Sequence, residues 1–209
     1  MTAHRKVIRR SALIATAAVA ALVLAACGGG GHDMGSMESD SSPSKSASAK
    51  AGAHNEADAD FATEMIQHHR QAIEMADVAA DRASSQEVKD LATKIKGAQD
   101  PEIETMSGWL TSWGEEVPEG MSGMEGHDMS SDTPGMMSGE DMDKLEKASG
   151  AEFDKMFLEM MVEHHEGAIE MAKTEKVDGK YGPATKLADD VITAQTADIE
   201  QMNEMLGKS

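Results

Sequence analysis

The sequence is poor in three kinds of residue, and each shortage excludes a class of structure or partner. Only one of the 209 residues is a cysteine, so no disulfide can form within the chain. Aromatic residues make up 3% of the sequence, and no long stretch alternates polar and apolar residues, so strand signals are missing. Acidic residues outnumber basic ones, 38 against 19, which gives a formal net charge of −19. Such a chain is a poor partner for nucleic acid and for anionic lipid.

The N-terminal segment has the pattern of an export signal. Several basic residues are followed by an apolar stretch, residues 11–26, that is too short for a comfortable permanent membrane span. Leu24-Ala-Ala-Cys27 then has the form of a bacterial lipobox. We predict a lipoprotein signal peptide over residues 1–26, acylation of Cys27, and anchoring at the extracytoplasmic face of the cell membrane. The alternative is an ordinary signal peptide with an incidental cysteine.

The rest of the chain divides into a tether and one folded domain. Residues 27–55 are rich in Gly, Ser and Ala without apolar periodicity, so we predict a disordered tether. Residues 56–207 are numerous enough to build a core. Within them we predict a first hairpin over 56–114, a methionine-rich linker over 115–139 and a second hairpin over 140–207.

The strongest pattern is an internal repeat around a doubled histidine. FATEMIQHHRQAIEMA, which begins at Phe61, returns as FLEMMVEHHEGAIEMA from Phe157, at an offset of 96 residues. The offset continues without a gap through the segment that follows each copy. A gap-free repeat indicates two copies of one supersecondary unit, so a site made by one copy should have a symmetry mate in the other.

Dense helix signals make each copy a predicted helical hairpin. The expected starts are Asn55 with Asp58, the capping boxes Ser84–Glu87 and Ser149–Glu152, and Pro183; the expected stops are Trp113-Gly114 and Asp178-Gly179, and a short extra helix is expected over Glu140–Lys147. The predicted fold is all-α: an antiparallel four-helix bundle made of two repeated hairpins.

Helical phase places polar residues on the inner faces. His69 and His165 each fall near the middle of an apolar stripe, with His68 and His164 at its edge. The stripe of the first helix contains Phe61, Met65, His69, Ala72, Ile73, Ala76 and Ala80. The partner helices carry polar residues on their own apolar faces: Gln99 and Glu102 in the first hairpin, Gln195 and Asp198 in the second.

Two accounts of this polar core remain open. In the structural account, each inner histidine donates to the carboxylate of Glu102 or Asp198 and fixes helix pairing. In the functional account, His68, His69, His164 and His165 bind a metal together with those carboxylates and the thioethers of Met65 and Met161. A ferroxidase-type di-iron centre is not expected, because no histidine of the repeat has a glutamate three residues before it.

A second candidate site lies in the linker between the hairpins. The chain has 18 methionines, and several gather with a histidine in a Gly-, Ser- and Asp-rich stretch that offers nothing to pack against: Met121, Met124, His127, Met129, Met136 and Met137. Thioethers and imidazole suit Cu(I), so we predict a copper site here. Low-complexity sequence without a ligand is the alternative.

These motifs resemble the DUF305 family (domain of unknown function 305). The resemblance rests on the segment Met65–Ala76, on Pro134-Gly-Met-Met-Ser138 and on the segment Phe153–Ala172, and it covers about residues 57–206. It implies a ferritin-like four-helix fold, export or lipid anchoring, copper binding in some members and no established enzymatic activity.

We therefore expect an extracytoplasmic, membrane-anchored lipoprotein that binds copper for buffering or resistance and is not an enzyme. Its expected partners are the membrane, through Cys27, and a metal ion; a homodimer is compatible with the bundle. The alternatives are a ferritin-like redox enzyme and an envelope or stress protein whose polar core is purely structural.

Overall fold

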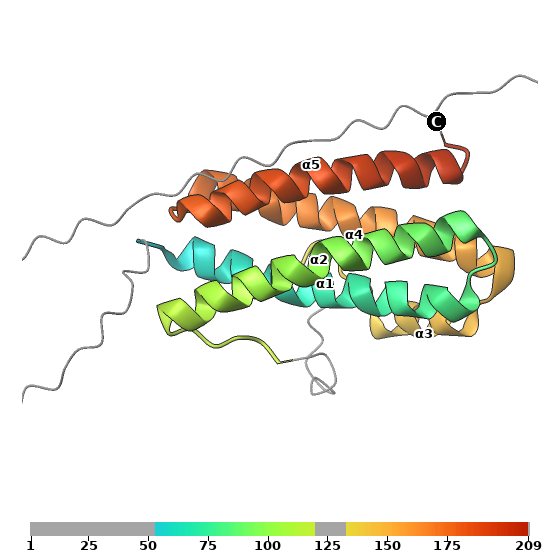
Figure 1. Ribbon diagram of the computed structural model, residues 1–209, viewed down its shortest axis with the longest axis horizontal. Helices are drawn as coiled ribbons and strands as arrows, with labels where there is room; N and C mark the ends of the chain where they lie inside the picture. Colours follow the sequence, from blue (N-terminus) through green and yellow to red (C-terminus); the bar gives the residue numbers. More distant parts are fainter. Residues whose placement is uncertain (1–52, 120–132, 209) are drawn as a thin grey trace, which may run out of the picture. The chain divides into compact units, whose positions relative to one another are not determined.

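The computed structural model describes residues 53–119 and 133–208, and every regular element in these ranges is a helix (Figure 1). The five helices are α1 (Glu56–Arg82), α2 (Gln86–Trp113), α3 (Gly139–Lys147), α4 (Gly150–Asp178) and α5 (Gly182–Met205). The predicted all-α bundle is confirmed. No helix in the described ranges is long and apolar enough to cross a membrane. The predicted signal peptide, Cys27 and most of the tether lie outside the described residues.

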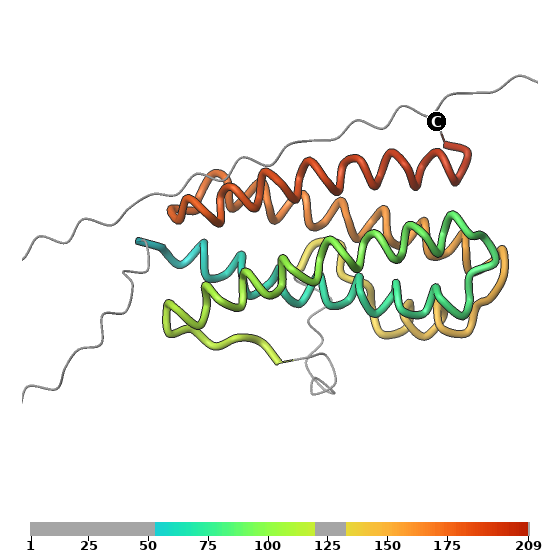
Figure 2. Tube along the Cα trace, in the orientation of Figure 1, coloured from blue at the N-terminus to red at the C-terminus, as the bar shows by residue number. Residues whose placement is uncertain are grey.

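The long helices form two hairpins that meet along α1 and α4. α1 packs on α2, α4 packs on α5, and α1 with α4 makes the main contact between the hairpins (Figures 1 and 2). The short helix α3 packs against α1 and α4. α1 and α4 are the two helices that carry the doubled histidines, so the repeat brings both copies of the motif to one interface.

Several helix ends follow the sequence signals. Asn55 and Asp58 form a reciprocal capping box at the start of α1, with distances of 3.1 Å from the Asp58 amide to Asn55 Oδ1 and 2.7 Å from the Asn55 amide to Asp58 Oδ2. Gly114 ends α2 in the left-handed conformation, at φ 83°. α4 ends at Asp178, and Pro183 stands in the first turn of α5, as predicted.

The other two predicted capping boxes are wrong. The N-cap of α2 is Ser85, because Asp154 of α4 binds the Ser84 amide at 2.9 Å and the Ser84 hydroxyl at 2.5 Å. A carboxylate from another helix thus holds Ser84, and the local cap moves to Ser85, whose hydroxyl accepts from the Val88 amide. Ser149 does stand at the N-cap of α4, but its side chain makes no capping hydrogen bond.

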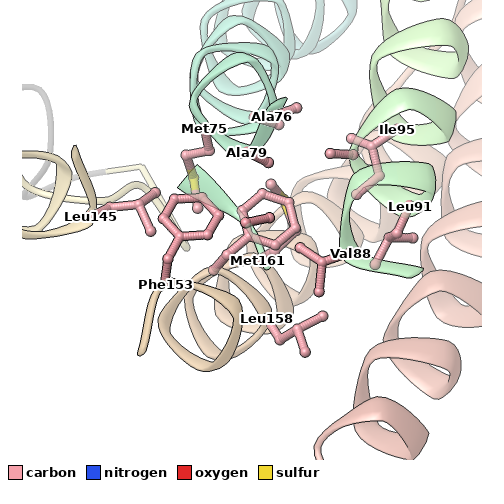
Figure 3. Close-up of a cluster of buried hydrophobic side chains, with 14 of the residues drawn as sticks. Met75, Ala76, Ala79, Val88, Leu91, Ile95, Leu145, Phe153, Leu158 and Met161 are labelled. Atoms are coloured by element: carbon pink, nitrogen blue, oxygen red, sulfur yellow. The ribbon is translucent and has the colours of Figure 1, made fainter. Parts of the chain in front are cut away.

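The apolar core consists of two clusters at opposite ends of the long helices. The first joins all five helices and includes Met75, Ile95, Leu145, Phe153 and Met161 (Figure 3). The second joins α1, α2, α4 and α5 and includes Phe61, Ile66, Leu110, Met171 and Ala188. The predicted inner faces are largely buried, although Ala80 is exposed and Ile73 is half-buried.

Residues 134–137, here called the strap, cross the α1–α4 interface. The Gln71 side chain of α1 binds the backbone of Met137 twice, accepting from its amide at 2.7 Å and donating to its carbonyl at 2.9 Å. Gly135 adopts φ 74°, and its backbone lies against Gly167 of α4. Met137 is buried in the first cluster, so the expectation that this methionine has nothing to pack against is wrong.

The contact between the strap and α4 depends on the absence of a side chain at Gly167. A Cβ atom there would overlap the carbonyl of Pro134, whereas one at Gly97, exposed in α2, meets nothing within 4 Å. We expect Gly167→Ala to lower the free energy of unfolding by about 1–3 kcal/mol. The control Gly97→Ala should raise it by about 0.5–1 kcal/mol. Thermal denaturation followed by circular dichroism measures both, and equal stability of the two variants would contradict the packing described.

Candidate metal centre

Four buried histidines form a layer between the two apolar clusters. His68 and His69 of α1 and His164 and His165 of α4 are all 0% exposed. The layer also includes Gln99 of α2 and Gln195 and Asp198 of α5. Along each long helix, the residues of the layer lie between those of the two clusters. Buried thioethers flank the layer, with Met65 and Met106 in one cluster and Met161 and Met202 in the other.

The prediction that His68 and His164 lie at the edge of the core is wrong. Their rings lie against one another at a tilt, with centroids 3.7 Å apart and planes inclined by 39°. Helical phase alone identified the face of α1 that packs on α2. It did not show that a second face of α1 is buried against α4 and beneath the strap.

Hydrogen bonds fix the tautomers of the two histidines on α1. His68 Nε2 donates to the Pro134 carbonyl at 3.2 Å, and His69 Nε2 donates to Glu102 Oε2 at 2.7 Å. A proton on Nε2 leaves the Nδ1 lone pair of each neutral ring free to bind a metal. Carbonyl and carboxylate groups in this position orient metal-binding histidines in many proteins.

The second copy of the motif departs from this pattern. His165 Nε2 lies 3.7 Å from Asp198 Oδ2, too far for a hydrogen bond. Lys94 of α2 binds the other oxygen of Asp198 at 2.5 Å and draws this carboxylate away from the ring. The structural account therefore holds for His69 with Glu102 and fails for His165 with Asp198.

Most ring nitrogens of the layer have no hydrogen-bond partner among the described residues. They are His68 Nδ1, His69 Nδ1, and both nitrogens of His164 and of His165. The side-chain oxygens of Gln99 and Gln195 are buried and unpartnered in the same way. An unsatisfied buried polar group costs about 1–3 kcal/mol, so the layer is unfavourable as a purely structural network.

Burial keeps the imidazoles of His68, His164 and His165 neutral. Loss of hydration lowers the pKa of His68 to about 3, with the neighbouring imidazoles of His69 and His165 acting in the same direction. Burial also lowers the pKa of His164 far below its ordinary value and lowers that of His165, where Asp198 partly opposes it. A neutral imidazole is the form that binds metal, so no proton needs to leave these rings at neutral pH.

The donor set suits a soft metal ion. Among the described residues, no three His, Cys, Asp or Glu side chains converge closely enough to hold a metal by themselves. Thioethers are therefore the additional ligands at hand, and Met65 and Met161 each lie one helical turn before an inner histidine, fully buried. Imidazole and thioether together favour monovalent copper or silver over hard cations.

The remaining predicted site residues are partly accounted for. Glu102 and Asp198 face His69 and His165 as expected. Met136 and Met137 belong to the strap, and the half-buried Met142 packs on the first cluster. Met121, Met124, His127 and Met129 lie outside the described residues.

Sequence reasoning missed the residues that hold the strap over His68. Gln71 and Gly167 occupy equivalent positions of the repeat, and both contact the strap, one through its amide and the other through its lack of a side chain. The sequence did contain a signal for them, because one copy of the repeat has glutamine where the other has glycine. It marks a place where the two copies have different neighbours.

The layer makes opposite predictions for two of its histidines in the metal-free protein. His164→Leu removes two unpartnered nitrogens, so we expect the free energy of unfolding to stay level or to rise by up to about 1–3 kcal/mol. His69→Leu breaks the bond to Glu102, and we expect a loss of about 1–3 kcal/mol. Chemical denaturation in the presence of a copper chelator measures both. A loss in His164→Leu as large as that in His69→Leu would show that His164 is a structural residue.

Comparisons with known proteins agree with this architecture. The family model described as "Domain of unknown function (DUF305)" matches residues 58–206. A crystal structure of a DUF305 protein from Streptomyces coelicolor is similar at 32% identity and a TM-score of 0.65, over 73% of this chain and 93% of that one. A DUF305 fragment from Deinococcus radiodurans is similar at 26% identity and a TM-score of 0.65, over 74% and 98%. No curated protein sequence matches the chain.

A third similar structure is that of CopM in its Cu(II)-bound form. It shares 35% identity with this chain at a TM-score of 0.60, over 71% of this chain and 94% of CopM. CopM has also been solved in Cu(I)-bound and Ag-bound forms. The family model spans most of the sequence and includes both doubled histidines, and the chain therefore belongs to the DUF305 family.

Proposed function

We propose that this protein binds copper in the histidine layer, as an extracytoplasmic protein of the bacterial envelope. The observation that carries the proposal is the set of buried imidazoles, most of whose ring nitrogens lack a partner among the described residues. Binding a metal would use the lone pairs that the apolar core leaves unsatisfied. The copper-bound and silver-bound forms of CopM, a relative of similar fold, support the same metal class.

The residues of the layer have distinct roles in this proposal. His68 and His69 offer Nδ1, because Pro134 and Glu102 hold the proton on Nε2. His164 and His165 offer either nitrogen, because neither ring is held by a hydrogen bond. Met65 and Met161 supply thioethers, and the apolar clusters on both sides keep water from competing with these soft ligands.

Storage or transfer of the ion fits these roles better than turnover of a substrate. The layer is closed over by the strap, and each of its histidines is fully buried. The linker methionines with His127 would supply a second, weaker copper site on the same chain. Acylation of Cys27 would keep the protein at the membrane, where buffering or passing on copper confers resistance. The Streptomyces coelicolor relative is assigned as a secreted protein, which agrees with an extracytoplasmic site of action.

Competition for Cu(I) against a chromogenic chelator tests the proposal on three variants of the full chain. We expect His68→Leu with His164→Leu to weaken Cu(I) binding by more than about 100-fold, since loss of an outer partner of a metal ligand alone costs 10–100-fold. The linker variant, with leucine at Met121, Met124 and Met129, should bind fewer Cu(I) ions per chain and keep the tight site. Met142→Leu with Met205→Leu, which removes two half-buried thioethers of the first cluster, is the control and should bind like the parent.

Two results would contradict this assignment. Tight binding that survives the loss of His68 and His164 would remove the histidine layer as the site. Tight binding lost in the linker variant alone would move the site to the linker.

A further inference from the structure

A cleft of about 400 Å³ opens between α1 and α4 beside the histidine layer. Its walls carry five carboxyl groups and one residue of the strap: Asp60, Glu64, Glu170, Glu175, Asp178 and Pro134. None of the five carboxyl groups forms an ion pair with a lysine, arginine or histidine of the described residues. Elsewhere on the described surface, acidic side chains do pair with lysines, as Asp77 does with Lys96 and Asp189 with Lys176. The cleft therefore gathers carboxyl groups, four of them exposed, without a countercharge from the described part of the chain.

Glu175 is the most deeply buried carboxyl group of the cleft. It is 1% exposed, and no group among the described residues donates a hydrogen bond to either of its carboxyl oxygens. Its neighbour Asp58 accepts hydrogen bonds from the Asn55, Lys180 and Tyr181 amides, and it is also the carboxylate to which a protonated Glu175 donates. Burial raises the pKa of Glu175 to about 8, and the carboxylates of Asp58 and Asp178 act in the same direction. A cation placed in the cleft would stabilise this group in its charged form.

Some residues that line the cleft lie on the same helices as His68 and His164, within two helical turns of them. On α1, Glu64 stands one helical turn before His68; on α4, Met171 stands two turns after His164, and both Glu64 and Met171 line the cleft. Pro134 lies between the cleft and the histidine layer, because it lines the cleft and its carbonyl accepts the hydrogen bond of His68. A cation in the cleft is thus separated from the His68–His164 pair by the strap.

We propose that this acidic cleft is the entrance through which a copper cation, with Cu(II) as the probe, reaches His68 and His164. The inference rests on the proposed function of the histidine layer. The carboxylates of the cleft attract a hydrated divalent ion and raise its local concentration. Among the described residues, no three of them converge to hold the ion, so it can leave the cleft for the histidines. Movement of the strap at Pro134 exposes Nδ1 and Nε2 of the histidines to it.

The rate of Cu(II) binding tests the proposal in the full chain. Stopped-flow quenching of Trp109 and Trp113 fluorescence reports binding, and the phase that disappears in His68→Leu with His164→Leu is the histidine-dependent one. Glu64→Gln with Glu170→Gln removes two exposed charges of the cleft without touching the layer. We expect the rate constant of the histidine-dependent phase to fall about ten-fold at low ionic strength, and the difference from the parent to shrink in 0.5 M salt.

The matched control is Glu104→Gln with Glu200→Gln, which removes two exposed charges outside the cleft. It should leave the rate close to that of the parent. Unchanged binding in the cleft variant, or equal slowing in the control, would overturn the entrance. If the parent shows no histidine-dependent Cu(II) phase while its Cu(I) affinity depends on His68 and His164, the entrance fails alone. If the Cu(I) affinity does not depend on these histidines either, the proposed function fails, so the two failures are distinguishable.

Discussion

The contact between the rings of His68 and His164 in the middle of the bundle is the one on which the other features depend. It places two neutral imidazoles where α1 meets α4, the main contact between the hairpins. The apolar clusters on either side dehydrate the layer, and the strap covers it through the Pro134 carbonyl. Stability of the metal-free fold therefore comes from the clusters, while the layer itself contributes unsatisfied polar atoms.

The two halves of the repeat make this layer together, and they do so unequally. One half has a histidine–carboxylate pair, His69 with Glu102, while in the other half Lys94 takes the carboxylate of Asp198. The strap crosses only one side of the pseudo-twofold arrangement, which requires glutamine at position 71 and glycine at position 167. Two similar hairpins thus enclose an asymmetric layer of histidines. The strap covers this layer on one side and separates it there from the acidic cleft.

Local patterns predicted most of the fold, because apolar periodicity and turn residues act within a few positions of the chain. Asn55, Gly114 and Pro183 fulfil the roles expected of them. The errors arise where a distant residue competes with a local one: Asp154 replaces the Ser84 cap, and α4 buries the face of α1 that carries His68. The identities of the histidines in the buried layer were readable from the repeat. The cleft was not, since its carboxyl groups come from both α1 and α4 and give no common signal in the sequence.

The central claim is that the imidazole nitrogens of the buried layer receive the metal. Nuclear magnetic resonance of ¹⁵N-labelled histidine side chains during titration with Ag(I), a redox-inert substitute for Cu(I), observes these nitrogens directly. The account predicts that the first equivalent of metal shifts Nδ1 of His68 and ring-nitrogen signals of His164, while His54 outside the layer is unchanged. Unchanged His68 and His164 signals, with shifts confined to His127 of the linker, would contradict it.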